Sequence, residues 1–276
     1  MEAACLSLTE CHWSLNHDSS PVRLPGMDEL PLGVFVRGVP GGTLEQVIIR
    51  LDILHALEHM GVVVYNTPEA IERTVDKAMT SFLLQQAGLP GPNTWVTESI
   101  GRTQQICAQE FRRGNKLLLK PLFGSQGTGI RLLENTADLE NVDEFNGLYY
   151  LQSFVRRKTS DWSDIRVFVI DGLARAAMLR KSESWLTNRA QGALCEPLKL
   201  DDRLRKLTEA AVAAVGIDYA GVDLIIDEND QLQIIEVNSI PAWWGLQKVT
   251  DLNIADALIE HFISRISTQT PMTVIP

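Results

Sequence analysis

The sequence of 276 residues contains no apolar run of 18 residues and no basic segment followed by an apolar one. The first absence excludes a membrane-spanning helix, which needs about 20 predominantly apolar residues. The second means that no signal peptide is expected. Cysteine is also scarce, with four residues and no CxxC pair. No disulfide framework is therefore predicted, and a reducing cytoplasm is the expected location.

Basic residues are fewer than acidic ones, with 25 Lys and Arg against 35 Asp and Glu, which gives a net charge of −10. This balance argues against a nucleic-acid partner, because neutralising phosphates requires clustered basic residues. It does not exclude an enzyme that binds a nucleotide in a locally basic cleft. Apolar residues make up 45% and charged residues 22%, which is typical of a globular protein long enough for two or three small domains.

The N-terminal part of the sequence predicts an irregular arm followed by a small α/β domain. Residues 1–31 contain three prolines and no periodic pattern. Residues 33–37 and 62–65 have the apolar character of strands, and the second is continuous, as in a strand buried on both faces. Between them, residues 44–57 have the three- and four-residue apolar spacing of a helix, with Thr43 as its N-cap.

The rest of the sequence mixes helices with strands, and turn signals such as Asp171-Gly172 join neighbouring strands as hairpins. Thr67 and Pro68 have the residue types of a helix start. This mixture predicts an α+β class with antiparallel sheet in the second half. Helices are predicted from Pro68 and at 76–87, 204–215 and 254–266, and strands at 117–120, 130–133, 149–155, 165–170, 222–226 and 232–237.

The first group that can carry chemistry is a glycine loop, Gly124-Ser-Gln-Gly-Thr-Gly129, which follows the strand ending at Lys120. Glycines allow backbone N–H groups to approach a phosphate without interference from a Cβ, and Lys120 adds a mobile cation. The segment lacks the Gly-Lys-Ser/Thr of a P-loop, and it is followed by a strand rather than the helix of a dinucleotide fingerprint. A plain glycine hairpin remains the alternative.

The second group is an acidic hairpin formed by Asp223, Glu236 and Asn238. Glu236 and Asn238 are two residues apart, so they project from the same face of a strand, and a hairpin brings Asp223 opposite them. Three oxygen donors among apolar neighbours are costly to bury unless a cation satisfies them. Oxygen donors suit Mg²⁺, and three solvated polar side chains on an open sheet face are the alternative.

Further polar groups stand beside these two. Arg166 follows Asp164 on a predicted strand, and Arg180 and Lys181 follow the next hairpin. An arginine near phosphates can stabilise charge that develops in phosphoryl transfer, although a surface salt bridge explains it equally well. The polar segment from Trp185 to Gly192 is interpreted only as a loop.

In order and spacing, these groups resemble the ATP-grasp superfamily, and within it the glutamate ligases of ribosomal-protein modification and lysine biosynthesis. The N-terminal segments Gly42–Gln46 and Tyr65–Glu72 most resemble ligases that add glutamate to tetrahydromethanopterin-type cofactors. The resemblance covers about residues 60–265. It rests on Asp76-Lys77, Lys120 with the glycine loop, Gln152-Ser-Phe-Val155, Ser163-Asp-Ile-Arg166, Thr187-Asn188, Ala220-Gly-Val-Asp223 and Glu236-Val-Asn-Ser239.

The resemblance implies an α+β ATP-grasp fold, in which two subdomains clasp ATP after a small α/β domain. The expected segments are 1–74, 75–148 with the glycine loop, and 149–268 with the hinge and metal site. The implied nucleotide-binding residues are Lys77, Lys120, Gly124, Ser125, Gln126, Gly127, Gln152, Ser153, Phe154, Val155, Asp164 and Asn188. The implied metal ligands are Asp223, Glu236 and Asn238, and the residues that face the reacting groups are Arg166 and Asn188.

The resemblance also implies a reaction, in which ATP activates a carboxylate as an acyl phosphate and an amine such as glutamate displaces the phosphate. The cofactors would be ATP and Mg²⁺, with Mn²⁺ as an alternative metal, and the acceptor a pterin cofactor or a peptide. Three positions depart from the family pattern, namely Ser153, Leu186 and Gln191. They leave open a catalytically silent nucleotide-binding module, and a kinase-like transfer is a third reading. The oligomeric state is left open, a homo-oligomer included.

Overall fold

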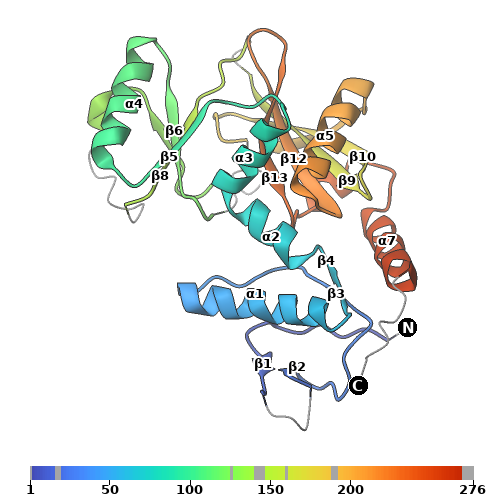
Figure 1. The fold of residues 1–276 in the computed structure, drawn as a ribbon. Coiled ribbons are helices and arrows are strands. Elements are labelled where there is room, and N and C mark those ends of the chain that lie inside the picture. The colour runs from blue at the N-terminus through green and yellow to red at the C-terminus, as the bar shows by residue number, and fades with distance from the viewer. Residues whose placement is uncertain are drawn as a thin grey trace. The chain divides into compact units, whose positions relative to one another are not determined.

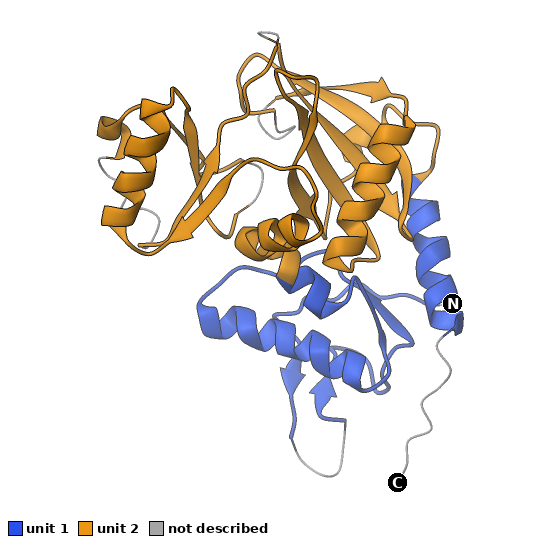
Figure 2. Ribbon diagram, turned by 45° about the horizontal axis from the view of Figure 1, so that its top comes forward, with its two compact units in different colours: residues 1–72, 254–276 blue, residues 73–253 orange. Residues whose placement is uncertain are grey.

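The computed structural model describes residues 2–15, 20–124, 127–139, 147–158, 161–187 and 192–268. The chain divides into two compact units, residues 1–72 with 254–276 and residues 73–253 (Figure 2). The point of division falls within helix α2 (Pro68–Val75). The sequence grouped the closing helix, α7 (Ile254–Thr268), with residues 149–253, whereas its contacts place it in the unit of the N-terminal residues. The boundary at 148/149 remains a prediction.

The first unit contains a parallel pair of strands, β3 (Gly33–Phe35) and β4 (Val63–Tyr65), joined through helix α1 (Leu44–His59) (Figure 1). All three residues of β4 are buried, as the continuous apolar pattern predicts. The Tyr65 ring packs near Phe262 of α7, and its hydroxyl lies 2.8 Å from His261 Nδ1. An aromatic cluster therefore ties α7 to this small sheet.

Helix α1 begins where the sequence predicts. The Thr43 side chain accepts from the Gln46 backbone amide, and the Gln46 side chain accepts from the Thr43 amide, which together form a capping box. The apolar face predicted for this helix is only partly buried, however, because Leu54 is fully buried whereas Leu44 is 72% exposed. Burial is confined to the C-terminal half of the helix, which packs on β4.

The N-terminal arm contains more structure than its composition predicts. A short antiparallel pair, β1 (His12–Trp13) and β2 (Val22–Arg23), forms within it. Val22 is 1% exposed, and β2 contacts α1. Two buried apolar side chains in a proline-containing segment, Val22 and Leu24, therefore anchor it, and they form no periodic pattern in the sequence.

The second unit contains two antiparallel sheets. The smaller has the order β5-β8-β6-β7, and its side chains alternate between two environments. Leu117, Leu119 and Leu151 on one face pack against helix α4 (Ile100–Arg112) in an apolar core. Neither α4 nor β5 was predicted from the sequence. The strand bounds are β5 (Thr94–Thr97), β6 (Leu117–Lys120), β7 (Arg131–Leu133) and β8 (Tyr149–Ser153), and a 3-10 turn, η1 (Thr136–Leu139), follows β7.

The larger sheet has the order β11-β10-β9-β12-β13, with every pair antiparallel. Asp171 and Gly172 join β9 to β10 with φ of 56° and 68°, the conformation of the predicted tight turn. Helix α5 (Asp202–Val215) packs against the middle strands and ends at Gly216 with φ of 75°. The strand bounds are β9 (Trp162–Ile170), β10 (Leu173–Ser182), β11 (Leu194–Leu198), β12 (Tyr219–Ile226) and β13 (Leu232–Asn238).

Two further helices complete this unit. Helix α3 (Lys77–Gln86) begins after Asp76, whose carboxylate accepts from the backbone amides of Ala78 and Met79 and so caps the helix. It packs against α5 and β13. The short helix α6 (Trp244–Gln247) follows β13. The α+β class predicted from the sequence is therefore confirmed.

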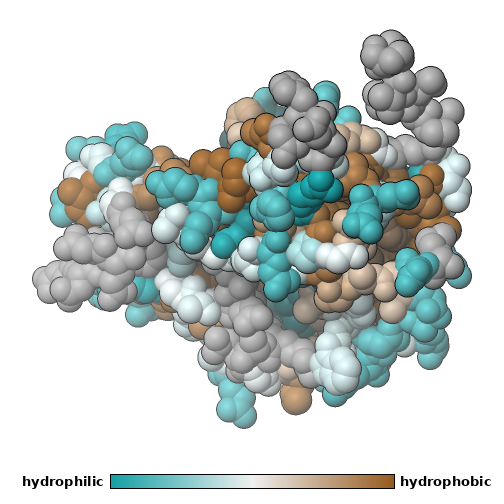
Figure 3. Space-filling model, turned by 90° about the horizontal axis from the view of Figure 1, so that it is seen from below, coloured by the Kyte–Doolittle hydropathy of each residue, from teal (hydrophilic) through white to brown (hydrophobic). Residues whose placement is uncertain are grey.

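Hydrophobic and hydrophilic side chains are interspersed over the face shown in Figure 3. Large exposed apolar side chains occur in several elements, for example Met79 and Phe82 in α3 and Leu173 in β10. Within the described ranges, no helix has the length and apolarity to cross a membrane.

Candidate active site

A cleft in the second unit is lined by both antiparallel sheets and by the glycine loop between β6 and β7. The smaller sheet contributes the face opposite to α4, which carries Lys120 and Gln152. The larger sheet contributes the face that carries Asp164 and Asp223. The cleft therefore brings together residues that the sequence places more than 100 positions apart, including most of the predicted site. Its lining includes Lys77, Gly124, Gly127, Ser153, Phe154, Val155, Arg180, Leu186, Thr187 and Glu236.

Two lysines supply the positive charge of the smaller-sheet side. Lys120 is 6% exposed and donates to Gln152 Oε1 at 2.5 Å. Lys77 donates to the carbonyls of Leu122 and Gly124 at 3.1 and 2.9 Å. Burial lowers the pKa of Lys77, and it lowers that of Lys120 to about 8, against the opposing attraction of Glu236. Both ammonium groups therefore lack a full counter-charge, which an anionic ligand would supply.

Gln152 positions Lys120 through hydrogen bonds, a role that was not predicted from the sequence. Its amide oxygen accepts from Lys120, and its Nε2 donates to Thr94 Oγ1 and to the Tyr150 hydroxyl, each at 3.3 Å. The Tyr150 hydroxyl in turn lies 2.8 Å from Ser81 Oγ of α3. Lys120 is thus positioned by a hydrogen-bonded chain that reaches α3. The only signal for it in the sequence is the two-residue spacing of Tyr150 and Gln152 on one strand.

The predicted hinge, Gln152 to Val155, begins in the last two residues of β8 and continues beyond it. The backbone amides of Ser153 and Phe154 donate to the carbonyls of Asn93 and Lys116, at 2.8 and 2.9 Å. The Val155 amide has no acceptor among the described residues. The Phe154 ring packs edge-on against Trp162 and Trp185, with centroids 6.0 and 6.1 Å apart.

Two tryptophans therefore border the hinge. In the sequence, only the family motif that contains Phe154 predicted a binding residue in this part of the cleft. The Ser153 hydroxyl oxygen is buried without a hydrogen-bond partner in the described structure. Leu186, which replaces the usual arginine of the resemblance, also lines the cleft.

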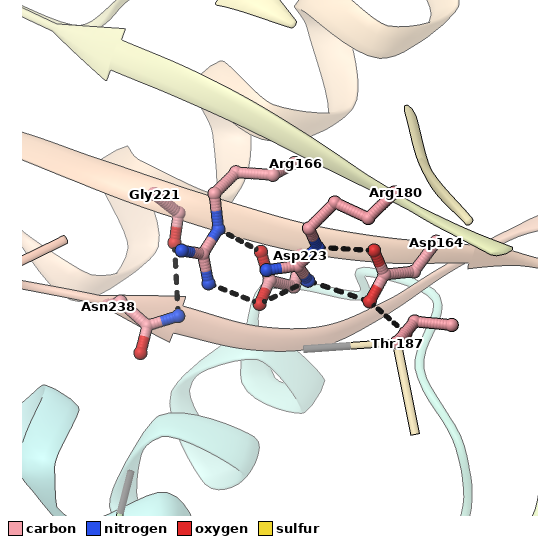
Figure 4. Close-up of polar contacts among 7 residues, drawn as sticks. All are labelled: Asp164, Arg166, Arg180, Thr187, Gly221, Asp223 and Asn238. Carbon is pink, nitrogen blue, oxygen red and sulfur yellow. Dashed lines mark hydrogen bonds and ion pairs between the residues drawn. The ribbon is translucent and has the colours of Figure 1, made fainter. Parts of the chain in front are cut away.

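Two acids and two arginines form a network on one face of the larger sheet (Figure 4). Asp164, Arg180 and Asp223 line the cleft, whereas Arg166 is not among its lining residues in the described structure. Asp164 on β9 stands opposite Arg180 on β10, and the guanidinium forms a forked pair with it at 2.5 and 2.6 Å. The Thr187 hydroxyl also donates to Asp164. Burial raises the pKa of Asp164 against the attraction of Arg180, whose own pKa is raised by the two acids around it despite burial.

Asp223 on β12 is held by both guanidiniums. Arg166 donates to its two oxygens at 2.6 and 2.7 Å, and Arg180 Nη2 lies 3.0 Å from Oδ2. Burial alone would raise the pKa of Asp223, but Arg166 and Arg180 together outweigh burial and lower it. The carboxylate is therefore ionised and faces the cleft with its charge shared between two cations. The sequence predicted this acid, but not its arginine partners.

The other two predicted metal ligands lie on β13. Glu236 is paired in register with Asp223, and Asn238 with Gly221, so the hairpin has the register that the sequence predicts. No described residue forms an ion pair or side-chain hydrogen bond with the Glu236 carboxylate. Asn238 Nδ2 donates to the Gly221 carbonyl at 3.5 Å, which leaves the amide oxygen as its acceptor group. The described residues contain no cluster of three His, Cys, Asp or Glu side chains that could hold a metal ion. The mixed set of Asp223, Glu236 and Asn238 stays a prediction.

Some predicted residues lie outside the described structure, namely Ser125, Gln126 and Asn188, with the neighbouring Arg189 and Gln191. The parts of the glycine loop that are described fit close approach by a ligand, since Gly127 has φ of 75°.

Three arginines are candidates for binding a substrate carboxylate, and all have other contacts. Arg180 is buried between Asp164 and Asp223. Arg50 donates to the carbonyls of Pro40 and Gly41, each at 2.8 Å, and Arg37 lies over the Phe35 ring.

Two antiparallel sheets with a glycine loop, two lysines and an acidic hairpin define the ATP-grasp class of fold. The structure of the ATP-grasp ligase PsnB complexed with minimal precursor, Mg and ADP matches it with a TM-score of 0.67. That match has 22% sequence identity and covers 94% of this chain and 86% of the other. The ATP-grasp fold expected from the sequence is therefore confirmed.

The model of the RimK-like ATP-grasp domain matches residues 74–262, and the chain belongs to this family. The tetrahydromethanopterin:alpha-L-glutamate ligase of Methanocaldococcus jannaschii is 39% identical over 79% of this chain and 76% of its own length. The ligase of the same name from Methanococcus maripaludis is 35% identical over 83% and 78%. The expectation of a C–N bond-forming ligase of the ATP-grasp family is thereby confirmed.

Proposed function

We propose that this chain is an ATP-dependent carboxylate–amine ligase that adds glutamate to a tetrahydromethanopterin-type pterin cofactor. The observation that carries the proposal is the cleft, in which two lysines with lowered pKa values face the Asp223–Glu236 pair. A nucleoside triphosphate with its divalent ion satisfies both halves of such a site at once. The names of two relatives that cover most of the chain supply the substrates.

The nucleotide would lie along the cleft with its phosphates at Lys77 and Lys120. The glycine loop, with Gly124, Ser125, Gln126 and Gly127, would cover the phosphates. The base would meet the hinge of Gln152 to Val155, where the Val155 amide, which has no acceptor among the described residues, offers a donor and the Phe154 ring an apolar wall. Asp164 would face the ribose.

Asp223, Glu236 and Asn238 would hold Mg²⁺, for which Mn²⁺ is an alternative. The donor set fits, because three oxygen ligands leave the remaining positions of an octahedral ion to water and phosphate. When bound, such an ion neutralises charge on the phosphate oxygens.

In the proposed reaction, an oxygen of the acceptor carboxylate attacks the γ-phosphorus and ADP leaves, which forms an acyl phosphate. The glutamate amine then attacks the acyl carbon, and phosphate leaves as the amide forms. Arg166 and Asn188 would face the reacting carbonyl, where a guanidinium stabilises the oxyanion. The glycine loop would exclude water, which otherwise hydrolyses the acyl phosphate. A cytoplasmic location belongs to the same proposal, since all four cysteines are free.

The test is ligation followed by mass spectrometry, with ATP, Mg²⁺, glutamate and tetrahydromethanopterin. We expect a product heavier by one or more glutamate residues, together with ADP release that requires both the acceptor and glutamate. Glu236→Gln should reduce the rate by at least about a hundredfold if it removes a metal ligand, whereas Glu228→Gln, in the exposed turn before β13, should not change it. A wild-type rate for Glu236→Gln at saturating Mg²⁺ would contradict the assignment.

A second candidate is a catalytically silent nucleotide-binding module, which the apolar Leu186 in the cleft favours. It predicts that ADP and ATP bind with Mg²⁺ but that no pair of acceptor and amine stimulates ADP release. Phosphorylated acceptor without amide would instead identify a kinase-like transfer.

A further inference from the structure

The two arginines that hold Asp223 are anchored very differently. Arg180 forms a forked pair with Asp164 as well as its contact with Asp223, and its side chain is 3% exposed. Arg166 forms its forked pair with Asp223 alone among the described acids, and its side chain is 14% exposed. If one guanidinium leaves Asp223, the structure therefore favours departure of Arg166.

These contacts occupy three of the about four lone-pair sites of the Asp223 carboxylate. Arg166 Nε donates to Oδ1 and Arg166 Nη2 to Oδ2, while Arg180 Nη2 contacts Oδ2 from the other strand. A carboxylate that coordinates a divalent ion directs the same lone pairs at the metal. Two cations at one carboxylate also repel each other strongly in a buried site. A divalent ion and the complete Arg166 fork therefore compete for Asp223.

Arg166 is less enclosed than Arg180, with a side chain that is 14% exposed against 3%. Its register partner on β12 is Asp223, and diagonally from it stands Gly221, where an added Cβ would lie 3.6 Å from Arg166 Nε. The guanidinium is thus bordered by a residue without a side chain on the side of Asn238, which is paired with Gly221 (Figure 4). Arg180, in contrast, is enclosed by Asp164, Thr187 and Asp223.

We propose that Arg166 and the divalent ion exchange at Asp223. The ion replaces the Arg166 fork, Arg180 keeps Asp164 and Asp223 in place, and the released guanidinium turns toward the reacting oxygens. Arg166 then serves as a counter-ion of Asp223 before the metal–nucleotide complex binds and as a substrate-facing cation afterwards. This inference rests on the metal site of the proposed function, and it adds a coupling between metal binding and the availability of Arg166.

Competition predicts that removing Arg166 tightens metal binding. The probe is Mn²⁺, titrated into the full chain in the presence of ADP, with free Mn²⁺ measured by electron paramagnetic resonance. We expect Arg166→Gln to bind Mn²⁺ about tenfold more tightly than the wild type, because a competing cation is lost. The control is Lys181→Gln, which should bind Mn²⁺ as tightly as the wild type. Lys181 follows Arg180 on β10 and forms an exposed ion pair with Glu196. Equal or weaker binding by Arg166→Gln would overturn the proposal.

A second measurement does not depend on the stability of that variant. In the wild type, the ¹⁵N–¹H signal of Arg166 Nε, identified by its loss in Arg166→Lys, reports the contact with Asp223. We expect Mg²⁺ with ADP to shift this signal and speed its exchange with water, while the Arg180 signal stays in place. An unchanged Arg166 signal at saturation would overturn the exchange.

Failure of the exchange and failure of the proposed function are distinguishable. Mn²⁺ binding with the predicted tightening, but without glutamate incorporation, would contradict the ligase and leave the exchange intact. Glutamate incorporation with no tightening would do the reverse. A wild-type chain that binds no Mn²⁺ in the presence of ADP would overturn both.

Discussion

Replacing Lys120 by Met should separate stability from nucleotide binding. Lys120 is 6% exposed, and its only hydrogen bond in the described structure is to Gln152 Oε1. Burial lowers its pKa to about 8. The folded protein therefore holds a proton less tightly than the unfolded chain does, and the ammonium group costs stability at neutral pH. Met has a similar length and carries no charge.

The size of this cost follows from the pKa difference. A fall from 10.5 to about 8 corresponds to about 3 kcal/mol, at about 1.4 kcal/mol for each pKa unit. The variant loses the hydrogen bond and leaves the Gln152 oxygen without its charged donor, which costs about 1–3 kcal/mol. At pH 7, we therefore expect the free energy of unfolding of Lys120→Met to exceed that of the wild type by about 0–2 kcal/mol.

The pH dependence gives the sharper test. Between pH 8 and 10.5 the unfolded chain still binds the proton that the folded protein has released, so wild-type stability gains up to about 1.4 kcal/mol per pH unit from this group. Lys120→Met lacks this gain. Urea denaturation at pH 7 and at pH 9.5 should therefore show the variant losing its relative stability as the pH rises. Lys181→Met, in an exposed pair with Glu196, is the matched control.

The same variant should lose affinity for ADP by at least about a hundredfold in calorimetry, because a buried charge-assisted contact to phosphate is worth about 3 kcal/mol or more. Loss of stability by several kcal/mol at pH 7, with no relative change at pH 9.5, would refute the reasoning about burial. Retained affinity for ADP would refute the phosphate contact.

Two further substitutions test the polar contacts of the cleft. Asp164→Asn breaks a buried pair and leaves the Arg180 charge undercompensated, so urea denaturation should show a loss of about 3–5 kcal/mol, whereas Asp230→Asn, in an exposed pair with Lys158, should lose less than about 1 kcal/mol. Gln152→Leu removes the acceptor of Lys120, which should lower the pKa of that lysine further. Calorimetry should then show ADP affinity falling at a lower pH than in the wild type, and an unchanged profile would contradict the role of Gln152.

Much of the fold could be predicted from local patterns in the sequence. Thr43, Asp171 and Gly216 each act within a few residues of their own position, as a cap, a turn and a helix end. The hairpin that pairs Asp223 with Glu236 is local as well, although its register shifts by one residue between Leu224 and Asp223, so the turn alone does not fix that pairing. Capping, turn chemistry and periodicity were therefore sufficient for these elements.

Such local patterns do not predict the contacts inside the cleft. Arg166 meets Asp223 because β9 pairs with β12, and the two residues are 57 positions apart in the sequence. The chain from Lys120 through Gln152 to Ser81 depends in the same way on the pairing of β6 with β8 and on the placement of α3. Pairings between distant strands are set by tertiary packing, and one sequence does not reveal them. Helix α4 was missed because two of its four buried residues, Thr103 and Glu110, are polar, so no apolar helical face is visible in the sequence.

One strand determines how far apart the parts of the site lie. Trp162, Asp164 and Arg166 occupy alternate positions of β9, and the edge-on packing of Trp162 on Phe154 and the network of Asp164 and Arg166 place them along one face. Alternate side chains of a strand are about 6.6 Å apart, because each residue advances the chain by about 3.3 Å. In the proposed function, backbone geometry therefore fixes the interval between the end of the cleft that binds the nucleotide and the end that faces the reacting groups. Substitutions in the surrounding loops leave this interval unchanged, whereas a single inserted residue in β9 would turn every later side chain of the strand to the opposite face.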